Sequence, residues 1–143
     1  ATGCSPVTTA IKNGSENIIP VKPNTIAKSI AIGNPADGYY GIKTANTSGG
    51  YGEDISDEEI VSAMKLLAET EGVFTETAGG VTVGVTQKLI QQGRIKPDEV
   101  TVICITGNGL KTQEALADCF PAPEVIEPNI KGFEEVFANS LTV

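Results

Sequence analysis

The chain has 143 residues, of which 40% are hydrophobic and 20% charged, as expected for one globular domain with its own core. Its 18 acidic and 10 basic residues give a net charge of -8, which disfavours binding to phosphate backbones. The chain has no tryptophan and 5% aromatic residues, so it offers few side chains on which bases could stack. We therefore expect one domain over residues 1–143 and no nucleic-acid partner.

Hydropathy and cysteine content constrain where the protein works. No apolar run approaches the roughly 20 residues that span a bilayer, and no basic start precedes an apolar signal core. The three cysteines, Cys4, Cys104 and Cys119, are an odd number without close pairing, which favours a reducing compartment over a disulfide framework or a zinc site. We expect a soluble cytoplasmic protein with no membrane partner and no bound metal.

The first third of the chain predicts two short helices and a long loop. Residues 5–14 contain a serine cap, a proline at the first helical position and a terminating glycine. Residues 25–32 can form a second helix, which Gly-Asn-Pro at residues 33–35 would end. Residues 37–52 are rich in glycine, tyrosine, asparagine and serine, which predicts a long surface loop.

Two longer helices are predicted in the middle of the chain. Ser56 and Glu59 form a capping box, and apolar residues then recur at helical spacing until Gly72. After a short predicted strand at residues 73–76, valine and leucine recur every fourth residue between residues 81 and 93. The β-branched residues of that second helix weaken its intrinsic propensity, so burial has to stabilise it.

The remaining elements complete a strand and helix alternation. Residues 98–106 predict a strand and residues 110–119 a helix, so the chain is expected to be an α/β protein with a parallel sheet. The tail over residues 121–143 contains three prolines and an amphipathic segment with Phe133, Val136 and Phe137. We expect this tail to pack back on the body.

The segment Val100–Lys111 is the most informative part of the chain. A β-branched apolar run ends at Thr106, which Gly107-Asn108-Gly109 follows. The carboxyl ends of parallel strands open onto the crevice where ligands bind, and glycines let the backbone approach a ligand closely. Thr106 is therefore a candidate ligand-binding residue. From the residues alone, a strand-end threonine that bonds its own loop is the simpler alternative.

Several segments, in the same order, resemble threonine synthases. They are Ala1-Thr-Gly-Cys-Ser-Pro, Ile32-Gly-Asn-Pro-Ala-Asp-Gly, Ser56-Asp-Glu-Glu-Ile, Glu71-Gly-Val-Phe-Thr-Glu-Thr-Ala-Gly-Gly-Val, Gly93-Arg-Ile-Lys-Pro-Asp-Glu and Ile105-Thr-Gly-Asn-Gly-Leu-Lys. The resemblance covers essentially the whole chain. It implies the carboxyl-terminal part of a pyridoxal phosphate enzyme of fold type II, the tryptophan-synthase-β-like fold, with a layered, partly parallel sheet and flanking helices.

The resemblance also implies roles for four residues. Thr106 would bond the ring nitrogen of pyridoxal phosphate, where a neutral hydroxyl leaves a weaker and more selective electron sink than an aspartate would. Glu76 would face the cofactor and orient the substrate or balance ring charge, although surface glutamates are far commoner. Gly33 and Asn34 would pass one face of the ring, although a plain helix stop explains them nearly as well.

Two parts of the family's site do not occur in this sequence. One is the Ser-Phe-Lys type motif that supplies the Schiff-base lysine, and the other is the Gly-Asn-rich loop that holds the phosphate. Lys28, Lys43 and Lys111 stand in other contexts and are interpreted as solvated or helix-end cations. We therefore assign no catalytic residue, and we expect an inactive fragment that lacks an amino-terminal part.

For the intact enzyme, the resemblance implies conversion of O-phosphohomoserine and water to L-threonine and phosphate. Strands that would pair with the missing part become open edges, so we expect a homodimer. A non-catalytic binding or assembly module and a threonine or serine dehydratase of the same fold are the alternatives. The acidic residues at 53–54 and 57–59 are interpreted as helix-dipole and solvated charges, in place of a metal site.

Overall fold

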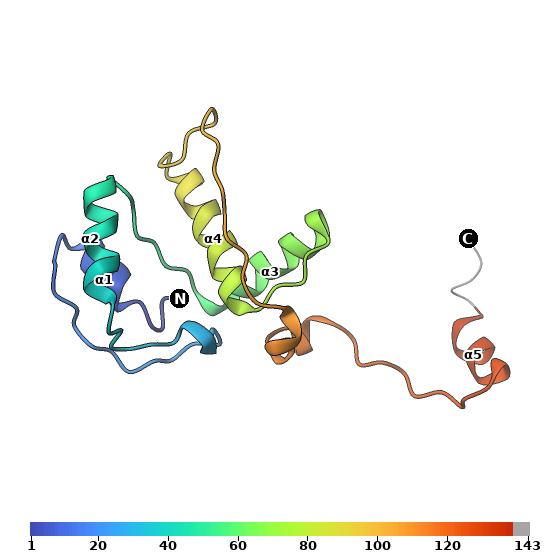
Figure 1. The fold of residues 1–143 in the computed structure, drawn as a ribbon. Helices are drawn as coiled ribbons and strands as arrows, with labels where there is room; N and C mark the ends of the chain where they lie inside the picture. Colours follow the sequence, from blue (N-terminus) through green and yellow to red (C-terminus); the bar gives the residue numbers. More distant parts are fainter. Residues whose placement is uncertain (139–143) are drawn as a thin grey trace.

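The computed structural model describes residues 1–138, which form mainly helices. In chain order these are α1 (Pro6–Lys12), η1 (Lys28–Ile30), α2 (Gly38–Ser48), α3 (Asp57–Glu71), α4 (Thr77–Gln91), η2 (Gly109–Lys111), η3 (Gln113–Cys119) and α5 (Ile130–Phe137), where η denotes a 3₁₀ helix. Figure 1 shows α1 and α2 together at one end, α3 and α4 in the middle, and α5 apart at the other end.

The pair α3 and α4 forms the centre of the fold, and both helices were predicted from local pattern. The Ser56 hydroxyl accepts the Glu59 N–H, and the Glu59 carboxylate accepts the Ser56 N–H, so the predicted capping box is confirmed. Ile60 and Met64 of α3 are almost fully buried. A Cβ on Gly80 of α4 would lie 2.6 Å from Met64 Cγ, so the glycine lets the two helices approach closely.

The predicted loop at residues 37–52 is wrong, because α2 occupies most of it. Helix α1, which was predicted correctly, packs along α2. Ile42 of α2 is fully buried, and Gly49, with φ at 69°, ends the helix. Burial of one isoleucine against the rest of the fold thus outweighs the weak helix propensity of a segment rich in glycine, asparagine and threonine.

The predicted helix at residues 25–32 is also wrong, apart from the single turn η1. The Asp57 carboxylate accepts the Thr25 hydroxyl at 2.5 Å and the Ile26 N–H at 3.1 Å. The Thr25 hydroxyl in turn accepts the Ala27 N–H at 3.2 Å. These side-chain bonds compete with a helical backbone at its first turn, and hold the segment against the start of α3.

The described residues do not form the expected layered sheet. Their only β-bridge is antiparallel and joins Thr75, in the predicted strand at 73–76, to Asn108, which lies two residues after the predicted strand at 98–106. The second segment runs back along α4, where Ile105 packs against Leu67 and Val83. Val100 and Val102 are 95% and 85% exposed. A strand exists only with a partner, and residues 1–138 provide none for the apolar run.

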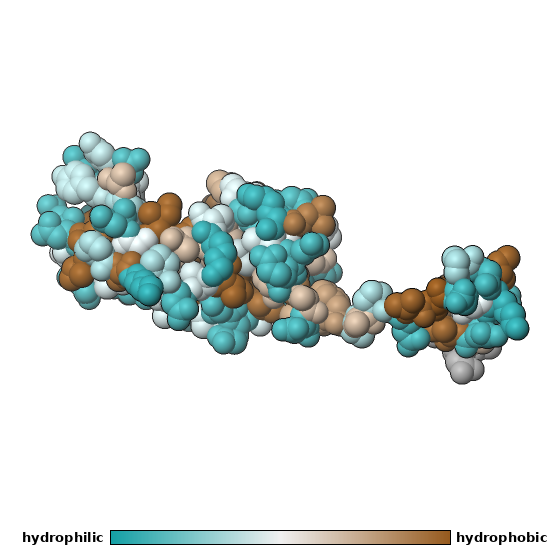
Figure 2. Space-filling model, turned by 90° about the horizontal axis from the view of Figure 1, so that it is seen from below, coloured by the Kyte–Doolittle hydropathy of each residue, from teal (hydrophilic) through white to brown (hydrophobic). Residues whose placement is uncertain are grey.

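The last third contains shorter helices than predicted. The expected helix at residues 110–119 is divided into η2 and η3, both of 3₁₀ type. Helix α5 confirms the amphipathic segment, and Asn129 caps it by accepting the Gly132 N–H. Figure 2 shows α5 as a separate lobe beyond a thin extended segment, with apolar atoms gathered beside that segment. The expected packing on the body is not seen for this part of the tail, and residues 139–143 lie outside the described residues.

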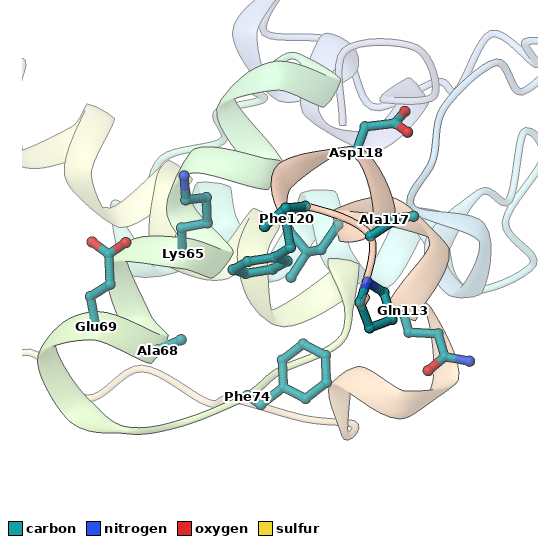
Figure 3. Close-up of a pocket in the computed structure, with 12 residues that line it drawn as sticks. Lys65, Ala68, Glu69, Phe74, Gln113, Ala117, Asp118 and Phe120 are labelled. Carbon is teal, nitrogen blue, oxygen red and sulfur yellow. The ribbon is translucent and has the colours of Figure 1, made fainter. Parts of the chain in front are cut away.

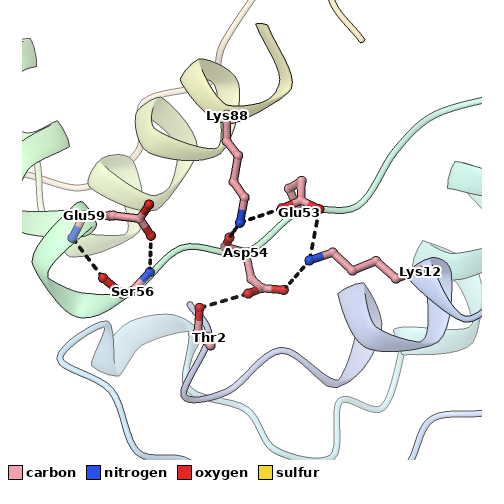
Figure 4. A network of polar contacts seen from close by, with 7 residues as sticks. All are labelled: Thr2, Lys12, Glu53, Asp54, Ser56, Glu59 and Lys88. Carbon is pink, nitrogen blue, oxygen red and sulfur yellow. Dashed lines mark hydrogen bonds and ion pairs between the residues drawn. The ribbon is translucent and has the colours of Figure 1, made fainter. Parts of the chain in front are cut away.

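A network of charged side chains joins α1 and α4 through residues 53 and 54 (Figure 4). Lys12 of α1 lies 3.0 Å from the Glu53 carboxylate and 2.8 Å from that of Asp54. Lys88 of α4 lies 2.8 Å from the second oxygen of Glu53. The Thr2 hydroxyl donates to Asp54 at 2.9 Å. Glu53 and Asp54 are therefore structural partners of cations from two helices.

None of the helices within residues 1–138 combines the length and the apolar character that crossing a membrane requires.

Candidate functional site

The loop at residues 106–109 lies against the residues that lead into α4. The Glu76 N–H donates to the Gly107 carbonyl at 3.3 Å, and the Gly109 N–H donates to the Phe74 carbonyl at 3.0 Å. The Thr75 hydroxyl also reaches the Gly107 carbonyl at 3.4 Å. The structure thus joins two sequence-predicted site regions, the one that contains Glu76 and the one that contains Thr106.

Gly107 is required at the point where these two segments meet. Its φ is 77°, in the left-handed region that residues with a side chain rarely adopt. A Cβ at this position would overlap the Glu76 carboxyl group. The close approach that the structure shows at this glycine is to Glu76, and approach of the loop to a ligand stays a prediction.

Glu76 is a buried carboxylate with two partners. The residue is 4% exposed and directly precedes α4. Lys111 Nζ lies 2.9 Å from its Oε2, and the Ser29 hydroxyl donates to its Oε1 at 3.4 Å. Three segments that are distant in sequence, η1, η2 and the start of α4, converge on this one carboxylate.

The first turn of α4 is held by a second polar contact beside Glu76. The Thr112 hydroxyl accepts the Thr77 N–H at 3.1 Å, and both residues are buried. The Thr77 hydroxyl is buried without a hydrogen-bond partner in the described part of the chain. Buried hydroxyls normally have a hydrogen-bond partner, so the Thr77 hydroxyl is a polar group whose hydrogen-bonding capacity is unused within residues 1–138.

The other two predicted residues lie on the segment after η1. The Gly33 carbonyl accepts the Val21 N–H at 3.0 Å, and a Cβ on Gly33 would overlap the Val21 carbonyl. Asn34 is exposed. Ser29, within η1, bonds Glu76, and no side-chain bond joins Gly33 or Asn34 to it among the described residues. The roles of Gly33 and Asn34 at a ring face stay predictions.

A large pocket lies elsewhere, between α3, η3 and the segment after it. It has a volume of about 920 Å³, and its lining includes Phe74, Leu116 and Phe120. Figure 3 shows the rings of Phe74 and Phe120 facing the same space, with Lys65 and Glu69 of α3 at its rim. None of the four predicted site residues lines it. Its lining is mainly apolar, and the charged side chains in it are those of Lys65, Glu69 and Asp118.

Four of the five acidic residues at 53–59 have partners that explain them. Glu53 and Asp54 pair with lysines, Asp57 bonds the segment before η1, and Glu59 caps α3. Within residues 1–138, no group of three or more His, Cys, Asp or Glu side chains is arranged to hold a metal ion.

The chemistry at the loop fits the ring of the predicted cofactor. Thr106 is exposed, and no hydrogen bond within residues 1–138 engages its hydroxyl. A free, neutral hydroxyl can donate to or accept from a pyridine nitrogen. Buried Glu76 adds an anion that is already paired with Lys111 and bonded by Ser29. These residues suit one edge of the ring and leave the phosphate to other groups.

Sequence reasoning missed Lys111 and Ser29 as part of this site. The Lys111 side chain is 61% exposed, as its interpretation as a surface cation implies, yet its ammonium contacts a carboxylate that is 5% exposed. Its place at the end of the Thr-Gly-Asn-Gly-Leu-Lys segment was the available signal. Nothing local to Ser29 indicates its contact.

Comparisons with known proteins agree with the resemblance to threonine synthases. The chain is 41% identical over 128 residues to a threonine synthase of Methanocaldococcus jannaschii, covering 89% of the chain and 32% of that protein. It is 39% identical over 137 residues to a threonine synthase of Methanosarcina acetivorans, covering 94% and 34%. With a threonine synthase of a Bacillus species it shares 46% identity over 90 residues, covering 63% and 26%. The chain thus spans about a third of the length of these curated relatives or less.

A family model described as pyridoxal-phosphate dependent enzyme matches residues 1–107. The family's cofactor, pyridoxal phosphate, is the one predicted. Its fold is the predicted tryptophan-synthase-β-like fold, although the described residues do not by themselves form its sheet. Since the match covers most of the chain and includes both Glu76 and Thr106, the chain belongs to the pyridoxal-phosphate dependent enzymes.

Proposed function

We propose that the chain is the carboxyl-terminal part of a threonine synthase, which converts O-phosphohomoserine and water to L-threonine and phosphate. The observation that carries this proposal is similarity to two archaeal threonine synthases over 89% and 94% of the chain. The Thr-Gly-Asn-Gly-Leu-Lys segment adds support, because its Gly107 and Lys111 contact the buried Glu76 and the residue before Gly107, Thr106, carries a neutral hydroxyl.

When bound, pyridoxal phosphate supplies an electron sink that draws charge from the substrate carbon. Thr106 would bond the ring nitrogen and hold the ring in one orientation without protonating it. Glu76 would place a fixed negative charge at the same edge, while Gly33 and Asn34 would line one face of the ring. In this proposal the chain contributes one wall of the site.

The reacting lysine and the phosphate-binding loop would come from the rest of the protein. The isolated chain would then be inactive, because none of its lysines stands in the family's lysine motif. Its partners would be that amino-terminal part, the substrate O-phosphohomoserine and a second copy in a homodimer.

The test is an assay of the whole protein that contains this chain. It should release phosphate from O-phosphohomoserine and form L-threonine, and Thr106→Val should lower kcat while Thr101→Val, on the exposed segment before it, should not. Formation of a 2-oxo acid from threonine, with no activity on phosphohomoserine, would favour the dehydratase alternative. Absence of both activities in a protein that binds pyridoxal phosphate would favour a non-catalytic module.

The isolated chain provides a second test. After it is mixed with pyridoxal phosphate and reduced with borohydride, mass spectrometry should find no single lysine modified in preference to the others. Selective modification of one lysine would contradict the proposed inactivity.

A further inference from the structure

The ion pair between Lys111 and Glu76 lies at the loop that follows Thr106, whereas Lys12 and Lys88 pair with residues 53 and 54. We propose that Lys111 is a positioning residue: it holds the Glu76 carboxylate against Gly107 and thereby fixes the loop that carries the Thr106 hydroxyl. The inference rests on the proposed function where it concerns the cofactor. Its structural part can be tested without the cofactor.

The glutamate of this ion pair is buried, whereas the lysine is not. The Glu76 side chain is 5% exposed, whereas that of Lys111 is 61% exposed. A buried carboxylate that loses its cation is strongly destabilised, while an exposed ammonium that loses its anion is solvated by water. The pair therefore acts mainly on the glutamate. Ser29 cannot replace the lysine, because its hydroxyl carries no charge and contacts the other oxygen.

The loop at residues 106–109 is attached to the segment before α4 on both sides of Asn108. The Glu76 N–H bonds the Gly107 carbonyl, and the Gly109 N–H bonds the Phe74 carbonyl. Lys111 is the last residue of η2, two residues after Gly109, and its ammonium forms an ion pair with Glu76. The loop is thus bound to the segment at 74–76 by two backbone bonds and closed by one ion pair. Thr106 precedes the first of these contacts by one residue.

Gly107 and Glu76 are closely packed. A Cβ on Gly107 would overlap the Glu76 carboxyl group, so the carboxylate and the loop backbone occupy adjoining space without slack. If the carboxylate turns away to find water, the loop loses the surface against which it packs. Lys111 therefore fixes the Glu76 carboxylate, and the carboxylate in turn fixes the backbone at Gly107 and the residue before it, Thr106.

The test is amide hydrogen exchange of the full chain without cofactor. Lys111→Met should accelerate exchange of the Glu76 and Gly109 amides about fivefold, the change expected when a partly exposed ion pair is lost. Lys111→Arg should restore the wild-type rates. Lys43→Met, on the exposed side of α2, is the matched control and should leave both amides unchanged. Far-UV circular dichroism checks that each variant is folded.

A double-mutant cycle separates positioning from a general effect of charge. In a Glu76→Gln background, Lys111→Met should change exchange of the Gly109 amide by less than about twofold, because the group that the lysine holds is gone. The proposal is overturned if Lys111→Met exchanges like Lys43→Met, or if its full effect persists in the Glu76→Gln background.

The link to the cofactor is tested on the whole protein. Lys111→Met should shift the absorption spectrum of bound pyridoxal phosphate and lower kcat more than it raises KM, and Lys111→Arg should restore both. An exchange effect with an unchanged spectrum would refute positioning of the cofactor contact. Failure of the unmodified whole protein to act on phosphohomoserine would instead refute the proposed function and leave the exchange result standing.

Discussion

Gly107 and Glu76 pack against each other so closely that no side chain fits between them. A Cβ on the glycine would overlap the carboxyl group, and the glycine backbone has φ at 77°. The first constraint comes from a residue distant in sequence and the second from the turn itself. Both act at the position directly after Thr106, so they tie the placement of that hydroxyl to the glutamate.

Gly107→Ala should therefore lower the free energy of unfolding by about 3 kcal/mol, the sum of left-handed strain and overpacking. Gly93→Ala is the control, because Gly93 has φ at 67° but no atom within 4 Å of an added Cβ. Its loss should be about 1 kcal/mol, from the backbone alone. Urea denaturation measures both values. Equal losses would show that contact with Glu76 contributes nothing.

The capping box of α3 gives a second prediction. Ser56→Ala removes the hydroxyl that accepts the Glu59 N–H and should lower the free energy of unfolding by about 1 kcal/mol. Ser62→Ala is the control on the same helix, since that hydroxyl only bonds the Glu58 carbonyl within the helix. Its effect should stay within about 0.5 kcal/mol. Thermal and urea denaturation should rank the two variants in this order.

The charged network between α1 and α4 predicts a loss of stability in acid. The Lys88 ammonium bonded to Glu53 lowers the pKa of that carboxyl below its usual 4.5. Burial alone would raise the pKa of Asp54, yet its bonds from Lys12 and Thr2 bring it below 3.8. A lowered pKa contributes stability above the unfolded value, and this contribution disappears as pH falls through the folded value.

The free energy of unfolding should therefore decrease as pH falls from about 5 to about 3. Glu53→Gln should make this decrease shallower, whereas Glu16→Gln, at an exposed position without an ion pair among the described residues, should leave it unchanged. Urea denaturation at a series of pH values provides the measurement. An unchanged slope for Glu53→Gln would mean that the network does not stabilise the folded state.

The helices that could be predicted are those whose signals lie within one segment. For α3 the cap, the apolar spacing and the terminating glycine all occur between residues 56 and 72, and the structure uses each of them. The segments predicted wrongly depend on distant residues. Thr25 is bonded by Asp57, and α2 exists because Ile42 is buried. No local pattern contains either fact.

The candidate site was predictable only as separate residues. A resemblance of motifs indicates Glu76 and Thr106 one at a time, but their contact through Gly107 is a property of the folded chain. Lys111 shows the limit most clearly. Its neighbours in sequence predict an exposed cation. The ion pair that it forms depends on Glu76, a buried residue directly before α4 that lies close only in the folded chain.

The segment at residues 98–106, which pairs with no strand among the described residues, predicts self-association. Val100 and Val102 are 95% and 85% exposed, and an apolar segment with free backbone groups is a template for strand pairing. The isolated chain should therefore form dimers at high protein concentration. Val102→Lys should shift it toward monomer, because a charge at an edge opposes pairing.

Val125→Lys is the matched control, since Val125 is fully exposed but lies in the extended segment before α5. Sedimentation velocity distinguishes the species. A clean monomer of the unmodified chain at high concentration, or equal effects of the two lysine variants, would show that this segment is not the edge through which copies associate.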